Sequence, residues 1–155
     1  MLDKILVPLD GSELAEQILP VVEELAPRLS AEVILLQAVI SSAEAMRETL
    51  PGTGTTPELG IDIARQRVES ETSSAERYLK TVSGRLGLQG LKVNTTVCEG
   101  PPAAAILEQA KEQNASLIAL ATHGRSGLAR AVMGSVADAV VRDSEAPVLL
   151  VRAKD

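Results

Sequence analysis

The chain has 155 residues, of which 45% are apolar, and its formal net charge at pH 7 is −6. This length predicts a single domain over residues 1–155 with a substantial core. That core must be aliphatic, because the sequence has no Phe or Trp and only one Tyr, Tyr78. The negative charge and the lack of aromatic platforms for stacking bases both argue against a nucleic-acid partner.

The number of cysteines and the hydropathy of the sequence limit the cellular compartments in which the protein is expected. Cys98 is the single cysteine, so an intramolecular disulfide is excluded, and a small apolar role fits it best. Apolar runs stay well short of membrane-spanning length, and the N-terminus enters a strand-like run without the layout of a signal peptide. We therefore expect a cytoplasmic protein with no membrane partner.

The first half of the chain reads as two buried strands joined by a helix. Continuous apolar runs at 4–9 and 33–40 are typical of strands covered on both faces. Pro8 should mark the carboxyl end of the first strand, because proline cannot donate to a ladder. Ser12 is a suitable N-cap for the helix, whose apolar residues then recur every three or four positions.

Three features interrupt this pattern. Pro20 should kink the first helix or remove one of its backbone hydrogen bonds, and Pro27 could end it early. The segment 41–57 is rich in Pro, Gly and Thr and predicts a flexible loop inserted into the domain. Such a loop can serve as a lid or an interaction arm, or it can be an insertion without a role.

The second half alternates helices and strands. In order, we predict a long helix at 58–86 ended by Gly87 and Gly90, a strand at 91–97, a helix opening at 100–102, a strand at 116–121, a helix beginning at 134–135 and a strand at 146–152. Apolar and polar residues alternate in the 91–97 strand, so one of its faces should be exposed to solvent and the strand should lie at a sheet edge.

Five strands alternating with four helices predict an α/β fold with a doubly wound parallel sheet. A strand order of 3-2-1-4-5 places the 91–97 strand at an edge and makes the first and fourth strands neighbours at the switch point. Ligands bind beyond the carboxyl ends of the strands at such a point. Residues 8–10 and 121–124 should therefore lie on opposite sides of one crevice.

The stretch from 121 to 135 is typical of a strand, a loop of small residues and a helix start. A helix start presents unpaired N–H groups and the positive end of its dipole, which favours an anion. Gly124 and Gly134 would let the backbone approach a phosphate closely, and the Ser135 hydroxyl could add a hydrogen bond.

The same residues also have simpler interpretations. Asp10 could cap the first helix, and Ser135 could be an N-cap, a role compatible with a phosphate contact. Arg125 and Arg130 could be solvated surface charges. His123, the sole histidine, has no acid or thiol beside it in sequence and fits a structural loop residue better than a base.

Four stretches carry a family pattern: ILVPLDGS at 5–12, CEGP at 98–101, THG at 122–124 with GSV at 134–136, and PVLLVR at 147–152. Over essentially its whole length the chain resembles the universal stress protein superfamily. The resemblance implies a fold that is Rossmann-like and adenine nucleotide alpha hydrolase-like. Members of the family that bind ATP carry Gly, two residues, Gly, nine residues, Gly, then Ser or Thr.

This chain matches that pattern at Gly124, Gly134 and Ser135, and has Ala121 at the position of the first glycine. Alanine keeps its N–H and adds one methyl group, so the pocket should tighten rather than close. The resemblance implies a bound ATP, or ADP or AMP. It also implies magnesium held through the phosphates, without side-chain ligands.

The resemblance assigns a role to each position. Asp10 would accept hydrogen bonds from the ribose hydroxyls, while Pro8 and Leu9 would wall the pocket. The Ala38 backbone would hydrogen-bond the adenine, and Leu120 would pack against it. Arg125 could supply countercharge to the phosphates, which would lie on the backbone N–H groups around Gly124, Arg125, Gly134, Ser135 and Val136.

These features predict an ATP-binding regulatory protein of the stress response, in which nucleotide biases conformation or the choice of unknown protein partners. The apolar strand at 147–152 should lie at a sheet edge, and the resemblance implies a homodimer through it. The alternative is an interaction protein on the same fold that binds no nucleotide, which Ala121 favours. An enzyme is not expected beyond slow ATP hydrolysis, because the sequence has no Gly-Lys pair of a Walker motif.

Overall fold

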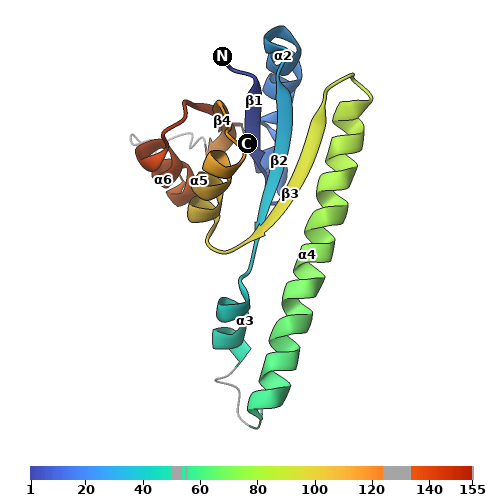
Figure 1. Cartoon of the computed structure of the whole chain (residues 1–155), viewed down its shortest axis with the longest axis vertical. Coiled ribbons are helices and arrows are strands. Elements are labelled where there is room, and N and C mark those ends of the chain that lie inside the picture. Colours follow the sequence, from blue (N-terminus) through green and yellow to red (C-terminus); the bar gives the residue numbers. More distant parts are fainter. Residues whose placement is uncertain (50–53, 55, 124–133, 155) are drawn as a thin grey trace.

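The computed structural model describes residues 1–49, 54, 56–123 and 134–154. Its strands form one parallel sheet in the order β3-β2-β1-β4-β5, as predicted (Figure 1). The strands are β1 (Lys4–Pro8), β2 (Glu32–Val39), β3 (Val93–Glu99), β4 (Leu117–His123) and β5 (Val148–Ala153). The alternating strand is at one edge and the last strand is at the other.

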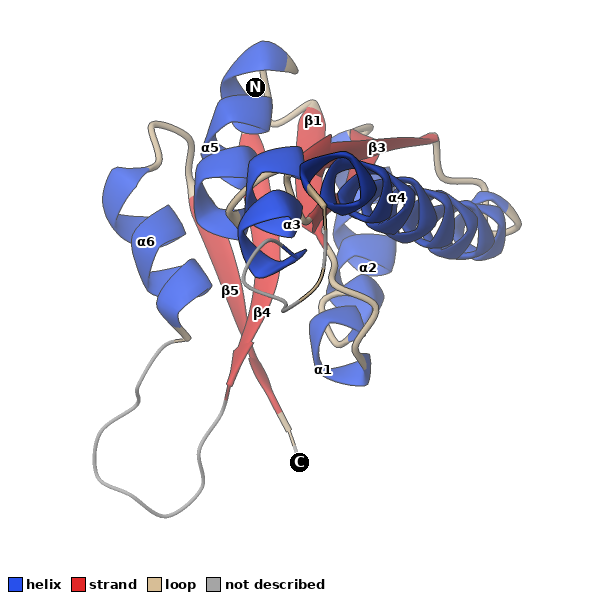
Figure 2. Cartoon of the chain, turned by 90° about the horizontal axis from the view of Figure 1, so that it is seen from below, coloured by secondary structure: helices blue, strands red, loops and turns tan. Residues whose placement is uncertain are grey.

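Helices cover both faces of this sheet. They are α1 (Glu13–Glu16), α2 (Leu19–Leu29), α3 (Ser42–Thr49), α4 (Pro57–Gly87), α5 (Pro102–Glu112) and α6 (Ser135–Asp143). The first core cluster lies under α2 and α4, and the second lies under α5 and α6. Figure 2 shows α5 and α6 on one side of β4 and β5, with α1 and α2 on the other.

Successive residues of β1 explain why its sequence is continuously apolar. Ile5 and Val7 pack in the first cluster, whereas Leu6 packs in the second, and all three are fully buried. Burying each such side chain contributes about 1.5–3 kcal/mol. The core is aliphatic, as the composition predicts.

The predicted first helix is in fact two helices, α1 and α2. Pro20 lies in the first turn of α2, where a missing N–H costs no helical hydrogen bond, so it begins a helix instead of kinking one. Pro27 lies inside α2, which continues to Leu29. The prediction that Pro27 ends the helix early is therefore wrong. The helix ends at Ser30, whose φ of 53° is left-handed.

The segment 41–57 is not wholly a loop, because α3 occupies Ser42–Thr49 within it. The Ser41 hydroxyl accepts a hydrogen bond from the Glu44 N–H at 3.2 Å, which is the capping contact that begins this helix. Ala45 of α3 is buried against Ala64 and Val68 of α4 in a small separate cluster. Residues 50–53 and 55 of the predicted loop lie outside the described residues.

The longest helix, α4, has 31 residues and extends well beyond the sheet (Figure 1). It ends at Gly87, and Gly90, with a φ of 87°, turns the chain toward β3, as predicted. In the described ranges, neither α4 nor another helix has the length and hydropathy of a membrane span.

Candidate ligand-binding site

The sheet opens where β1 and β4 separate. These strands pair at Ile5↔Leu117 and Leu6↔Ile118, whereas the pairing of β1 with β2 continues to Pro8↔Leu36. The Leu9 N–H then donates to the Leu36 carbonyl at 2.8 Å. Beyond Leu6 the first strand thus follows β2 away from β4. The gap lies at the carboxyl ends of the strands, which is the predicted switch point.

A cavity of about 280 Å³ occupies this gap. Most of the residues predicted for the site line it, namely Pro8, Leu9, Asp10, Ala38, Leu120, Ala121, Gly134, Ser135 and Val136. The two remaining predicted residues, Gly124 and Arg125, lie outside the described residues. The structure therefore brings the two halves of the predicted site together around one hollow.

Sequence reasoning missed several lining residues: Leu14, Ala15, Leu36, Pro102, Ile106 and Ala137. Thr122 and His123 also line the cavity; they lie in the stretch 121–124 that was predicted to flank it, but were given no ligand contact. Three of the missed residues had a usable signal. Pro102 and Ile106 are four residues apart and share one face of α5. Leu36 could have been found from the parallel register, because it lies opposite Pro8.

Asp10 shapes the turn that leads into α1. Its Oδ1 accepts hydrogen bonds from the Ser12 N–H at 2.9 Å and from the Ser12 hydroxyl at 2.5 Å. Gly11 between them has a φ of 84°, a conformation that glycine adopts without strain. Ser12 itself caps α1 by accepting from the Ala15 N–H at 3.1 Å. Asp10 is thus not the cap, and it lies exposed at the rim of the cavity.

The first turn of α6 forms another part of the wall. Gly134 is the N-cap and Ser135 is the first helical residue, so the interpretation of Ser135 as the cap is wrong. A glycine cap has no side chain to accept from the N–H groups of the first turn. A Cβ at Gly134 would meet the His123 ring at 3.8 Å, an ordinary contact, so none of the described residues crowds this position. The first turn of α6, at the positive end of its dipole, lines the cavity through Ser135 and Val136.

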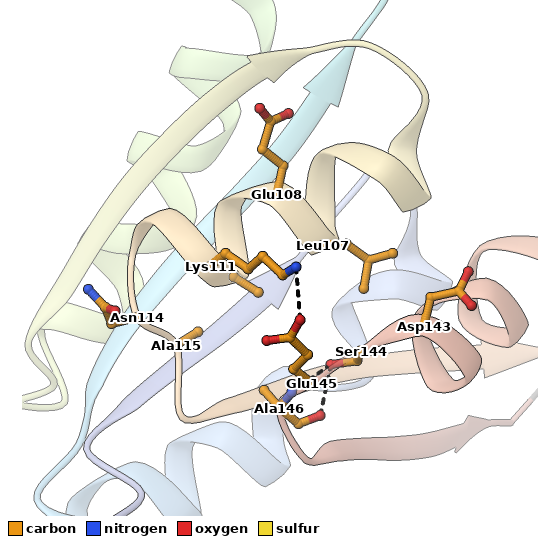
Figure 3. Close-up of a pocket in the computed structure, with 10 residues that line it drawn as sticks. Leu107, Glu108, Lys111, Asn114, Ala115, Asp143, Ser144, Glu145 and Ala146 are labelled. Carbon is orange, nitrogen blue, oxygen red and sulfur yellow. Dashed lines mark hydrogen bonds and ion pairs between the residues drawn. The ribbon is translucent and has the colours of Figure 1, made fainter.

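A second hollow lies at the opposite end of the sheet, between the end of α5 and the turn from α6 to β5 (Figure 3). It is larger, about 700 Å³, and some of the polar groups that line it are paired with each other. Lys111 Nζ contacts Glu145 Oε1 at 2.9 Å, with the two side chains 66% and 77% exposed. The Ser144 hydroxyl donates to the Ala146 carbonyl and accepts from the Ala146 N–H.

Two titratable groups that pack against the core have raised pKa values. Burial, with the carboxylates of Glu16 and Asp10, raises the pKa of Tyr78 to about 12. Burial also raises the pKa of the Cys98 thiol, which is partly buried against the second core cluster. In the described part of the chain, His, Cys, Asp and Glu form no group of three or more that could hold a metal ion.

The sheet order and the cavity at its switch point define a doubly wound α/β protein of the adenine nucleotide alpha hydrolase-like type. Residues 1–152 match the model of the universal stress protein family. The chain belongs to that family.

Individual relatives agree with this assignment over nearly their full lengths. The chain is 34% identical over 152 residues to universal stress protein YxiE of Bacillus subtilis, covering 98% of this chain and 100% of the relative. The solved structure of MJ0577 from Methanocaldococcus jannaschii matches with a TM-score of 0.79 and 26% identity, covering 100% and 99% of the two chains. The fold is also shared with At3g01520 of Arabidopsis thaliana, solved with AMP bound, at a TM-score of 0.66, 16% identity and coverage of 98% and 92%.

Proposed function

We propose that this protein binds an adenine nucleotide with magnesium in the cavity between β1 and β4, and acts in the cytoplasm as a nucleotide-dependent regulator of the stress response. One observation carries the proposal: an apolar cavity adjoins the N-terminus of α6, whose N-cap is a glycine and so has no capping side chain. This combination suits a ligand with a flat apolar part and a phosphate. The AMP bound to the Arabidopsis relative supports the same ligand class.

The apolar part of the cavity would take the adenine. Leu36 and Ala38 of β2 approach from one side, and Leu120 of β4 lies on the other. Ligand cavities commonly enclose about 300–1,000 Å³, so a volume of about 280 Å³ suits the nucleoside end of a nucleotide. The carboxylate of Asp10 at the rim would accept from the ribose hydroxyls.

The phosphates would lie at the first turn of α6, on the N–H groups of Ser135 and Val136. Asp10 is the one carboxylate among the residues that line the described part of the cavity. Magnesium would therefore be held mainly by phosphate oxygens and water, which is its usual preference. Its contribution when bound is to neutralise phosphate charge.

Homodimer formation belongs to the same proposal. The strand β5 is at the sheet edge, and its residues Val148 to Val151 are each only partly buried. An apolar edge with unpaired backbone groups favours pairing with a second copy. We expect a dimer by light scattering at micromolar concentration. Dimers that persist with Leu149→Lys plus Val151→Lys would contradict pairing through this strand.

The role that we propose is binding rather than turnover. Catalysed ATP hydrolysis at about 1 per second or faster, the range of ordinary enzymes, would contradict it. The chain has no Trp or Phe and one Tyr, so bound adenine would dominate its ultraviolet absorbance. The direct test is to purify the protein without added ligand, release bound small molecules with acid and record their absorbance and mass. We expect adenine nucleotide, or a higher melting temperature with Mg-ATP, and finding neither would reject the proposal.

A further inference from the structure

Thr122 is a polar residue in an otherwise apolar core. Its relative exposure is 8%, and it is the buried polar residue among those that the structure describes. Side chains alternate along β4, so Thr122 shares with Ile118 and Leu120 the face that packs against α5 and α6. A buried hydroxyl is unfavourable unless it is hydrogen-bonded. Its partner therefore indicates what the residue does.

That partner is the backbone of Gly134. Thr122 Oγ1 accepts a hydrogen bond from the Gly134 N–H at 3.3 Å, across twelve positions of sequence. Gly134 is the N-cap of α6, so the bond ties the end of β4 to the start of the helix. The body of α6 is anchored separately, because Ala137 and Val140 are buried in the core.

This bond changes which donors can serve a phosphate. The N–H of Gly134, predicted from the family pattern to hold phosphate, is already donated to Thr122. The first two residues of the helix, Ser135 and Val136, line the cavity and offer the next donors along the chain. A glycine cap supplies no side chain to hold this turn. Thr122 supplies from β4 the support that a capping side chain would otherwise give.

We propose that Thr122 is a positioning residue of the phosphate end of the site: its hydroxyl fixes the first turn of α6 so that the N–H groups of Ser135 and Val136 meet the ligand. This inference rests on the proposed nucleotide function. Without the hydroxyl, the first turn frays as helix ends do, and the direction of its donors is no longer fixed. The adenine end of the cavity, formed by Leu36 and Ala38, does not depend on this bond.

The test compares two ligands in three variants. Thr122→Val keeps the side-chain shape and removes the acceptor, and Thr122→Ser restores a hydroxyl. Thr95→Val, at an exposed position of β3, is the matched control. Dissociation constants for Mg-ATP and for adenosine are measured by titration calorimetry, together with each melting temperature. We expect Thr122→Val to weaken Mg-ATP roughly three- to tenfold, the effect of about one hydrogen bond, and to leave adenosine unchanged.

Thr122→Ser should retain most of the Mg-ATP affinity, and Thr95→Val should match the wild type. A merely structural role would weaken both ligands in parallel with a lower melting temperature, and that result would overturn the inference. Unchanged Mg-ATP binding in Thr122→Val would also overturn it. Both failures differ from failure of the proposed function, in which the wild type itself would bind neither ligand.

Discussion

The two hollows at opposite ends of the sheet differ in the chemistry of their linings, and this difference distinguishes a candidate ligand-binding site from a surface depression. The larger one, at the amino ends of the strands, is lined in part by an exposed ion pair, Lys111 with Glu145 (Figure 3). The smaller one, at the carboxyl ends, joins an apolar wall to a helix start capped by Gly134. An apolar wall that adjoins a helix N-terminus, rather than volume, therefore marks the candidate binding site.

The largest effect is expected from a negative charge placed at the start of α6, where the phosphates are proposed to bind. We predict that Gly134→Asp lowers the affinity for Mg-ATP by at least about a hundredfold, because the carboxylate repels phosphate and accepts from the same N–H groups. The fold should survive, because aspartate is a favoured N-cap and, among the described residues, a Cβ at this position meets only the His123 ring at 3.8 Å. Titration calorimetry measures the loss.

Two controls separate charge from shape in that experiment. Gly134→Asn adds a side chain of the same shape without charge and should weaken Mg-ATP less than the aspartate does. Gly84→Asp adds the same charge to an exposed position of α4 and should leave binding unchanged. If Gly134→Asp binds Mg-ATP as the wild type does, the phosphates do not lie at α6. An interaction protein that uses no nucleotide would instead keep its partners in this variant.

Filling the adenine end should have the next largest effect. Ala38 lines the cavity from β2, so Ala38→Leu would place three additional carbons where the base is expected. We predict at least about a tenfold loss of adenosine affinity, comparable to the 1–3 kcal/mol of a single misfit in an apolar pocket. The same substitution at the exposed Ala43 of α3 is the control. Equal adenosine affinity in both variants would contradict the assigned orientation of the ligand.

Substitutions in the hollow at the amino ends of the strands should not affect nucleotide binding. Lys111→Met removes an exposed ion pair with Glu145, which is worth less than about 1 kcal/mol. We predict unchanged affinity for Mg-ATP and a urea midpoint close to that of the wild type. A clear loss of nucleotide binding in Lys111→Met would indicate that the ligand binds beside Lys111, and would contradict binding in the cavity between β1 and β4.

The smallest predicted effect is on the pH dependence of stability, and it concerns Tyr78, which packs against the first core cluster. The pKa of its hydroxyl is raised to about 12 in the folded state, above the ordinary value of about 10. The folded protein therefore holds this proton more tightly, so its stability should fall as pH rises from about 10 to about 12. Tyrosinate absorbance reports this one group, because the chain has a single tyrosine.

Two substitutions check that titration. Tyr78→Phe should remove this part of the alkaline loss of stability, as measured by urea unfolding at several pH values. Asp10→Asn should lower the pKa of Tyr78 slightly, because the Asp10 carboxylate contributes to the upward shift. A tyrosine that titrates near its ordinary value in the folded wild type would contradict the burial of its hydroxyl.

The sequence was most informative where burial dictates residue type. Continuous apolar runs identified the central strands, and the alternation in 91–97 placed β3 at an edge, which together determined the sheet order and the position of the cavity. The helix α3 was missed because Pro and Gly after it dominated the composition of 41–57, while its stabilising contact, Ala45 against α4, is tertiary. Thr122 was missed for a similar reason, since its partner Gly134 is twelve residues away.

The most direct test is a crystal structure of the protein grown with Mg-ATP. Adenine should lie between β2 and β4, close to Ala38 and Leu120, with phosphate oxygens on the N–H groups of Ser135 and Val136. Nucleotide bound instead beside Lys111 at the other end of the sheet, or a cavity that holds only water at saturating Mg-ATP, would contradict this account.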